Sequence, residues 1–155
     1  DCNQSENRLF FKLPHFQMCA IFRTLPSIFA VPEYPWEQNR IGVSCAPLKI
    51  SQGTWLLPYH GKQDDTVGYT QSFMLLEEQF NELPRIVSRP AERLLYADQP
   101  WELEGEFAIP CLFTCSAVLK KDGNLLMGYG AADKVAGIAE CDFMSLLQEL
   151  RKFCH

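Results

Sequence analysis

Three features are missing from this sequence: a long apolar run, a cluster of basic residues and a paired-cysteine motif. No apolar run approaches the roughly 20 residues that a bilayer-spanning helix needs, and no signal peptide opens the chain. The formal net charge is −5, with 14 Lys and Arg against 19 Asp and Glu, whereas a protein that tracks nucleic-acid phosphates needs clustered cations. We therefore expect no membrane span, no nucleic-acid partner and a cytoplasmic location.

The seven cysteines form neither a CxxC pair nor a Cys/His spacing typical of a zinc site. Their number is odd, and Cys111 and Cys115 lie within an apolar run. This usage favours reduced cysteines in the core of a cytosolic protein, with a disulfide framework or a metal site as the alternatives. The chain begins with Asp1 rather than Met, which indicates a fragment or a trimmed chain.

Short apolar runs follow one another along the chain. With 47% hydrophobic residues the sequence is sufficient for one domain, which we expect to span residues 1–155. Ten prolines and nine glycines interrupt the runs, a pattern that favours an all-β fold over alternating strands and helices. The predicted strands are Met18–Arg23, Cys45–Ile50, Thr54–His60, Tyr69–Leu76, Leu112–Leu119, Asn124–Gly130 and Val135–Glu140.

A helical pattern occurs only at the C-terminal end. Asp142 can cap a helix there, because its side chain can accept from the first turn. Apolar residues then recur at three- and four-residue intervals: Phe143, Leu146, Leu147, Leu150 and Phe153. The sequence therefore predicts a short C-terminal helix.

Two segments resemble each other, CAPLKISQGTWLLPYHGKQDD and CSAVLKKDGNLLMGYGAAD. Each contains an apolar strand, a turn glycine, a second apolar strand, a tyrosine and an acidic residue. Tyr59 and Tyr129 lie six residues after Gly53 and Gly123, and the interval between the copies is 70 residues. Consecutive blades of a β-propeller would give such similarity, and a plain β-sandwich is the alternative.

Five motifs occur in order along the chain, and together they resemble a known family. They are WEQNRIG from Trp36, APL from Ala46, GTWLLPYHG from Gly53, ELEG with the following PCLF from Glu102, and YGAAD from Tyr129. This order resembles the C-terminal half of glycoside hydrolase family 130, the β-mannoside phosphorylases and related hydrolases. The resemblance covers residues 36–152 and is weak over residues 1–35.

The resemblance implies a five-bladed β-propeller with an active site on its axis, of which this chain would form about half. It also implies that phosphate cleaves a β-1,4-mannoside to mannose 1-phosphate. The partners would be a β-mannoside oligosaccharide and inorganic phosphate, with no metal or organic cofactor. The family's general acid is an Asp in an N-terminal portion without a counterpart here. We therefore identify no catalytic residue and expect little or no turnover by the chain alone.

The resemblance places four residues on the phosphate side of the site. Arg40 stands where the family usually has a phosphate-binding Lys, and a guanidinium grips phosphate with two hydrogen bonds. His60 follows Tyr59 at a strand end and can donate to phosphate or to a sugar hydroxyl. Tyr69 and Arg23 match a Tyr and an Arg that contact phosphate in the family. An exposed Arg, a packed His and a core aromatic are the alternatives.

Asp133 in the YGAAD motif is the carboxylate that the resemblance assigns to sugar hydroxyls, and the small residues before it would let a ligand approach the backbone. A turn residue facing water is the alternative. The chain departs from the family after the Glu-Gly segment, where EFAIPCLF lacks the usual Asn or His. We expect a weaker anion or sugar contact there.

The remaining acidic and aromatic groups have simpler interpretations. Asp64 and Asp65 are typical of a solvated turn. Glu102 and Glu104 would indicate a glycosidase only if their carboxyl groups faced each other across a bond. Tryptophans in a β-rich chain usually pack in the core, and stacking on a sugar is the alternative for the three present: Trp36, Trp55 and Trp101.

Two other functions remain open at this stage. Water can replace phosphate, which would make the parent enzyme a β-mannoside hydrolase. The chain can also be a noncatalytic sugar-binding or assembly module, because an incomplete propeller leaves open sheet edges that invite self-association.

Overall fold

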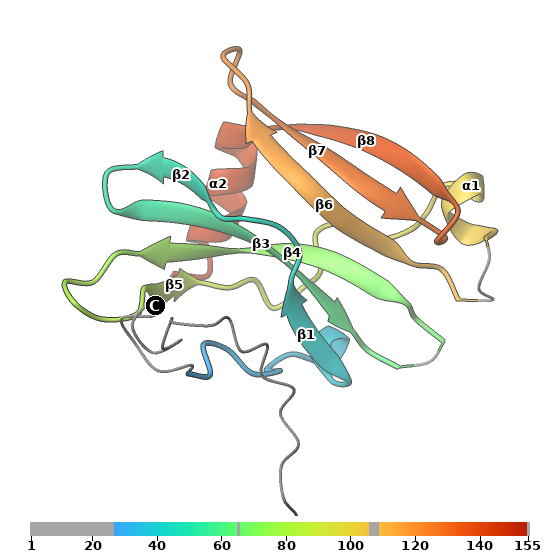
Figure 1. The fold of residues 1–155 in the computed structure, drawn as a ribbon, viewed down its shortest axis with the longest axis horizontal. Helices are drawn as coiled ribbons and strands as arrows, with labels where there is room; N and C mark the ends of the chain where they lie inside the picture. Colours follow the sequence, from blue (N-terminus) through green and yellow to red (C-terminus); the bar gives the residue numbers. More distant parts are fainter. Residues whose placement is uncertain (1–26, 65, 106–108, 155) are drawn as a thin grey trace, which may run out of the picture.

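Two antiparallel β-sheets and a C-terminal helix form the fold in the computed structural model, which describes residues 27–64, 66–105 and 109–154 (Figure 1). Within these ranges neither sheet closes into a barrel. The described residues contain no helix that is long and apolar enough to cross a membrane. The elements are η2 (Pro35–Glu37), β1 (Arg40–Val43), β2 (Leu48–Ser51), β3 (Thr54–Lys62), β4 (Tyr69–Glu77), β5 (Arg85–Ser88), α1 (Pro100–Leu103), β6 (Leu112–Leu119), β7 (Asn124–Ala131), β8 (Val135–Asp142) and α2 (Phe143–Arg151).

The first sheet is built around the hairpin of β3 and β4. Its strand order is β1-β3-β4-β5, and β2 also pairs with β3. β2 pairs with the first residues of β3, and β1 pairs with its last residues, so two short strands share one edge of β3. This arrangement brings residues of three strands together at the end of β3.

The second sheet has the order β6-β7-β8, and β6 packs against β3 and β4 of the first sheet. Figure 1 shows β8 at the far edge of the molecule from β5. The register of β6 shifts between Thr114 and Ser116, where Cys115 forms an irregularity in the strand. The β6 strand therefore forms the junction between the two sheets.

The core lies between the two sheets and helix α2. Asp142 caps this helix, since its Oδ1 accepts a 2.7 Å hydrogen bond from the Ser145 amide, as the sequence predicted. The buried apolar residues that meet there come from β3, β4, β7 and α2: Leu56, Phe73, Leu75, Leu125, Met127, Phe143, Leu147 and Leu150. Helix α2 thus covers one face of both sheets.

Most predicted strands form where the sequence placed them, and β3, β4, β7 and β8 run slightly further than predicted. Cys45–Ile50 is too early, because β2 begins at Leu48 after Pro47, which has no amide to donate to a ladder. Met18–Arg23 lies outside the described residues.

Four short elements were not predicted from the sequence. Strands β1 and β5 have four residues each, too few for a periodic pattern to be recognised. The expectation that only the C-terminal end is helical was wrong, because η2 and α1 form at two Pro-Trp-Glu triplets. In each triplet Pro occupies the first turn, where a missing amide costs nothing, and Glu closes a capping box.

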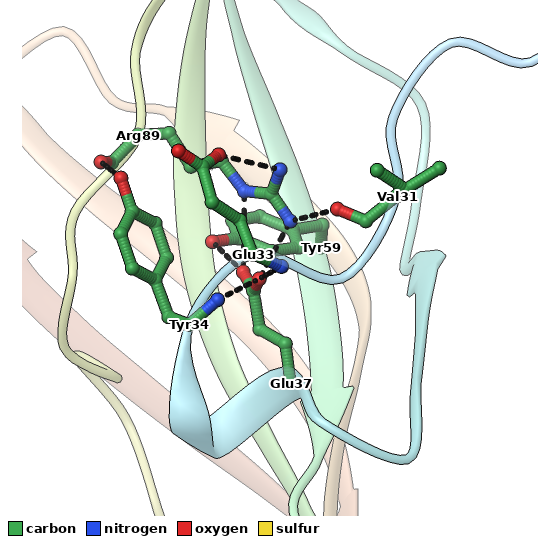
Figure 2. A network of polar contacts seen from close by, with 6 residues as sticks. All are labelled: Val31, Glu33, Tyr34, Glu37, Tyr59 and Arg89. Carbon is green, nitrogen blue, oxygen red and sulfur yellow. Dashed lines mark hydrogen bonds and ion pairs between the residues drawn. The ribbon is translucent and has the colours of Figure 1, made fainter.

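The Glu of the first triplet holds a buried polar network, which we call the first latch (Figure 2). Glu37 Oε2 accepts from the amides of Glu33 at 2.8 Å and Tyr34 at 3.1 Å, and Oε1 accepts from the Tyr59 hydroxyl at 2.8 Å. Arg89 Nη2 donates to Oε2 at 2.7 Å, and Nε donates to Oε1 at 3.2 Å. The first latch ties η2 to β3 and to the chain after β5.

The second triplet forms an equivalent network, which we call the second latch. Glu102 Oε2 accepts from the amides of Asp98 at 2.9 Å and Gln99 at 3.0 Å, and Oε1 accepts from the Tyr129 hydroxyl at 2.6 Å. Trp101 stacks on Tyr129 with ring centroids 6.0 Å apart. The repeat seen in the sequence therefore extends to the Pro-Trp-Glu triplets, which the sequence comparison missed.

Candidate functional site

A row of three polar side chains crosses β1, β3 and β4 at one end of the first sheet. Lys62 is the register partner of Arg40 on one side and of Tyr69 on the other. Residues directly opposite in antiparallel strands share a face, so the three side chains are neighbours. Arg40 Nη1 lies 3.5 Å from the Tyr69 hydroxyl oxygen, and its Nε donates to Asn39 Oδ1 at 2.8 Å. Two predicted residues are thus brought together, and Lys62 joins them.

A cavity of about 370 Å³ opens beside this row, between the first sheet and the second. Lys62 and Asp133 are its charged lining residues, and Tyr69 contributes a phenol. The remaining lining is apolar or backbone: Gly68, Ile109, Cys111 and Phe113. A cation and a carboxylate therefore face one small space across the junction of the sheets.

His60 lies next to Tyr69, on the same face of β3 as Lys62. Its ring packs edge-on against Tyr69 at 5.1 Å and against Phe113 at 4.6 Å between centroids. Burial lowers the pKa of the imidazole below its ordinary value of 6.5, because desolvation disfavours the charged form. The ring is therefore neutral at pH 7, and it is both a packed histidine and a neighbour of the cavity residues.

The absence of a side chain at Gly42 leaves room for the His60 ring. Gly42 is the register partner of His60, and a Cβ at Gly42 would lie 2.7 Å from Cε1 and Nε2 of the imidazole. Such contacts are too short for any side chain to be accommodated without movement. The glycine of the Arg-Ile-Gly motif thus leaves the space that the histidine occupies.

A chain of hydrogen bonds continues from His60 to the second sheet. Ser44 Oγ lies 3.2 Å from His60 Nδ1 and donates to Gln71 Oε1 at 2.8 Å. Gln71 Nε2 donates to the carbonyl of Leu112 at 2.5 Å. Because Gln71 is buried and bridges the two sheets, it holds His60 and the cavity wall of β6 in one arrangement. No local sequence signal marks Ser44 or Gln71, since their partners lie far along the chain.

Asp133 occupies the tight turn between β7 and β8. Ala132 and Asp133 both have a φ of 53°, and the Lys134 amide donates to the carbonyl of Ala131 at 3.1 Å, which closes a β-turn within the three-residue connection from Ala131 to Val135. The Ala132 amide donates to the carbonyl of Cys111 at 2.8 Å and fixes the turn on β6. Asp133 is exposed, yet it lines the cavity. The residue is therefore a turn residue and a cavity residue at once.

Cys111 lines the cavity within the segment where the family's Asn or His was missing. Burial raises the pKa of its thiol, and the nearby Asp133 carboxylate raises it further. The thiol is therefore protonated at neutral pH. Together with Ile109 and Phe113 it gives this wall an apolar character, and the described residues contain no group of three His, Cys, Asp or Glu that could hold a metal ion.

The acidic candidates Asp64, Glu102 and Glu104 do not line the cavity. Arg23 lies outside the described residues. Asp64 Oδ1 accepts from the Thr66 amide at 2.7 Å and the Val67 amide at 3.0 Å, so it forms the turn that the sequence predicted. Glu102 is buried in the second latch while Glu104 is exposed, and they form no facing pair.

The three tryptophans are absent from the cavity lining. Trp36 is buried in the first sheet's core, and the indole of Trp55 donates to Glu78 at 2.8 Å. Trp101 covers Tyr129 and is 43% exposed, which fits neither a core position nor the cavity. Core packing is thus confirmed for Trp36 only.

The fold resembles part of a solved structure. The structure aligns with that of a β-1,2-mannobiose phosphorylase from Listeria innocua, solved in complex with β-1,2-mannobiose, at a TM-score of 0.65. The alignment covers 79% of this chain and 33% of that protein, at 23% sequence identity. The chain therefore shares the fold of part of a carbohydrate-active protein.

The sequence also matches the profile of glycoside hydrolase family 130, described as beta-1,4-mannooligosaccharide phosphorylase, over residues 20–152. This chain belongs to glycoside hydrolase family 130.

Two curated relatives agree with this membership. A 1,2-beta-oligomannan phosphorylase from Thermoanaerobacter sp. (strain X514) is 33% identical over 104 residues, which is 67% of this chain and 33% of the relative. A Beta-1,4-mannooligosaccharide phosphorylase from Ruminococcus albus is 30% identical over 109 residues, which is 70% of this chain and 32% of the relative. The chain spans about a third of the length of these relatives.

Proposed function

We propose that this chain forms the phosphate-binding and mannose-binding part of a mannoside phosphorylase, as a portion of a five-bladed β-propeller. The observation that carries the proposal is the placement of Lys62 and Asp133 on opposite sides of one cavity, with Arg40 and Tyr69 in register beside Lys62. A phosphate needs convergent cations, and sugar hydroxyls need a fixed acceptor.

Phosphorolysis assigns a role to each group. Phosphate attacks the anomeric carbon on one side while an acid protonates the leaving oxygen on the other, so that the glycosidic bond breaks and mannose 1-phosphate forms. Arg40 and Lys62 hold the phosphate, and Tyr69 donates its phenolic hydrogen to a phosphate oxygen. His60 is neutral, and its one N–H points to Ser44 Oγ, which itself donates to Gln71. In this proposal His60 therefore packs against Tyr69 and holds it beside the phosphate. Asp133 accepts hydrogen bonds from the hydroxyls of the mannose.

The general acid belongs to another part of the propeller in this proposal. The described cavity contains one carboxylate, Asp133, which sits on the sugar side. The chain alone should then bind phosphate and mannose 1-phosphate but turn over slowly or not at all. Further blades, on the same polypeptide or another, would supply the acid.

The relatives differ from one another in the linkage of the mannosides that they are named for. The two curated relatives act on β-1,2-linked and β-1,4-linked mannans respectively, according to their names. We retain a β-1,4-mannoside as the proposed substrate because the family profile carries that description. Turnover of β-1,4-mannobiose and of β-1,2-mannobiose, each with and without phosphate, tests the assignment once the further blades that supply the acid are present. Release of free mannose in the absence of phosphate would instead indicate a hydrolase.

Binding of mannose 1-phosphate by isothermal titration calorimetry tests the site itself. The Arg40→Ala variant should bind at least about tenfold more weakly, since hydrogen bonds to a charged group are among the stronger ones. Arg85→Ala is the matched control, because Arg85 is an exposed arginine paired with Glu77 at 2.7 Å and does not line the cavity. Equal affinities for the two variants, or no binding by the wild-type chain at millimolar concentration, would contradict the proposal.

A further inference from the structure

The two latches share the amide, tyrosine and tryptophan contacts and differ in the contacts of an arginine. In both, a Glu in a Pro-Trp-Glu triplet accepts two amide hydrogen bonds through Oε2 and one tyrosine hydroxyl through Oε1. In both, the Trp of the triplet contacts that tyrosine. Among the described residues, an arginine joins the first latch alone: Arg89 donates to both oxygens of Glu37.

A strand positions the arginine of the first latch. Arg89 directly follows β5, which pairs with β4 along its outer edge. In the second sheet β7 corresponds to β3 and β8 to β4, since Gly53 and Gly123 make the equivalent turns with φ of 73° and 89°. The described residues contain no strand paired with the outer edge of β8. The described part of the second sheet thus lacks both the outer strand and the arginine that the first sheet has.

Glu102 is a buried charge without a cation. Its exposure is 3%, and in the described part of the chain no Arg or Lys contacts it. Burial alone would raise its pKa, but the hydrogen bonds from Tyr129 and from the amides of Asp98 and Gln99 outweigh burial and lower the pKa. The carboxylate is thus ionised at neutral pH and complementary to a guanidinium.

Residues around the second latch are more exposed than their counterparts in the first sheet. Trp101 is 43% exposed, whereas its counterpart Trp36 is 5% exposed. Ile138 in β8 is 75% exposed, whereas β4 is buried along nearly its whole length. An apolar edge strand with unpaired backbone groups is a template for another strand.

We infer that the outer edge of β8 is a docking site for an extended apolar segment from outside the described chain, whose arginine binds Glu102 over Tyr129. The segment adds antiparallel to β8 as β5 adds to β4. The Glu102 carboxylate is complementary in charge to an arginine. In the first sheet of the same chain, β5 and Arg89 already form the equivalent arrangement. The inference does not depend on the proposed phosphorylase function, because the second latch lies outside the cavity.

A peptide with the sequence of residues 84–91, PRIVSRPA, is the probe, because it carries the strand and arginine of the first latch. Binding to the wild-type protein should shift Trp101 emission to shorter wavelength and protect the amides of β8 from hydrogen exchange. The Trp101→Phe variant should lose the emission change. A peptide with Ala in place of Arg89 should bind roughly tenfold more weakly, and a peptide with Pro in place of Val87 should not add as a strand.

Variants of the protein distinguish the contribution of the Glu102 charge from that of strand pairing along β8. Glu102→Gln should bind both arginine and alanine peptides with equal affinity, while Glu104→Gln, which changes an exposed neighbour, should keep the preference. The comparison of the two peptides on the wild-type protein decides the question even if Glu102→Gln does not fold. Protection of β4 instead of β8, equal binding of the two peptides, or absence of any change at 1 mM peptide overturns the inference. Concentration-dependent dimers with protected β8 and no peptide present would identify a second copy as the occupant and overturn it too.

Discussion

The hydroxyl of Tyr129 donates a 2.6 Å hydrogen bond to the buried carboxylate of Glu102, and this contact fixes the short helix α1 on strand β7. The Tyr129→Phe variant should lose about 1 to 3 kcal/mol of unfolding free energy, because one oxygen of an ionised buried group loses its donor. Urea unfolding measures the loss. Tyr96→Phe, a change at a 49% exposed tyrosine, is the control and should stay within about 0.5 kcal/mol of wild type. Equal stability of the two variants would show that the hydrogen bond is not needed to hold α1.

Removal of Arg89 should be among the most damaging single changes in the first sheet. Arg89→Met leaves the fully buried Glu37 carboxylate without its cation, and breaking a buried pair in this way costs about 3 to 5 kcal/mol. The double variant Arg89→Met with Glu37→Gln should recover part of this loss, since no charge then remains buried. Urea midpoints of the three proteins check the order. A double variant that is less stable than Arg89→Met alone would argue against an uncompensated charge as the cause.

A methyl group at Gly42 should disturb the candidate site specifically. The Gly42→Ala variant places a Cβ 2.7 Å from the His60 ring, so the ring must leave its present position against Tyr69. We expect a fall in affinity for mannose 1-phosphate of about tenfold or more. Gly128→Ala is the matched control, because a Cβ there would also make a short contact, 2.8 Å to Ser116 Oγ, at a position that does not line the cavity. Titration calorimetry on both variants distinguishes a local effect of His60 from a general intolerance of alanine in the sheets.

The stability of the protein should depend on pH through His60. Its pKa in the folded state lies below the ordinary value of 6.5, so below that pH the unfolded chain takes up a proton more readily than the folded one. The contribution of neutral His60 is therefore fully present above about pH 6.5 and is lost as the pH falls through the folded pKa. Urea unfolding of wild type and His60→Gln between pH 7.5 and 5 measures it. The wild type should lose more stability on acidification than the variant, and parallel losses would refute the assignment.

Local sequence signals were sufficient for the parts of the fold that depend on neighbouring residues. The turn glycines Gly53 and Gly123 have a left-handed backbone, and the strands that follow them, β3 and β7, begin where predicted. The capping residue Asp142 and the apolar spacing after it located helix α2. The order of five motifs predicted the family, and the matched profile confirms that prediction.

Strand pairing decided what local signals left open. Lys62 has no motif of its own, and it belongs to the candidate site only because its register partners are Arg40 and Tyr69. Gln71 reaches Leu112 across 41 residues of sequence, and this contact positions one sheet on the other. Such contacts depend on how distant strands align, which the local pattern of each strand does not specify.

Local backbone preferences were enough to predict the mostly β fold and the C-terminal helix. The motifs were enough to predict the family and to name four candidate site residues: Arg40, His60, Tyr69 and Asp133. The tertiary structure alone placed Lys62 opposite Asp133 across a cavity. It also paired Glu37 with Arg89 over 52 residues, and among the residues that the structure describes it gave Glu102 no such partner. The physical reason is that burial and ion pairing depend on distances in space, which exist only once the sheets have packed.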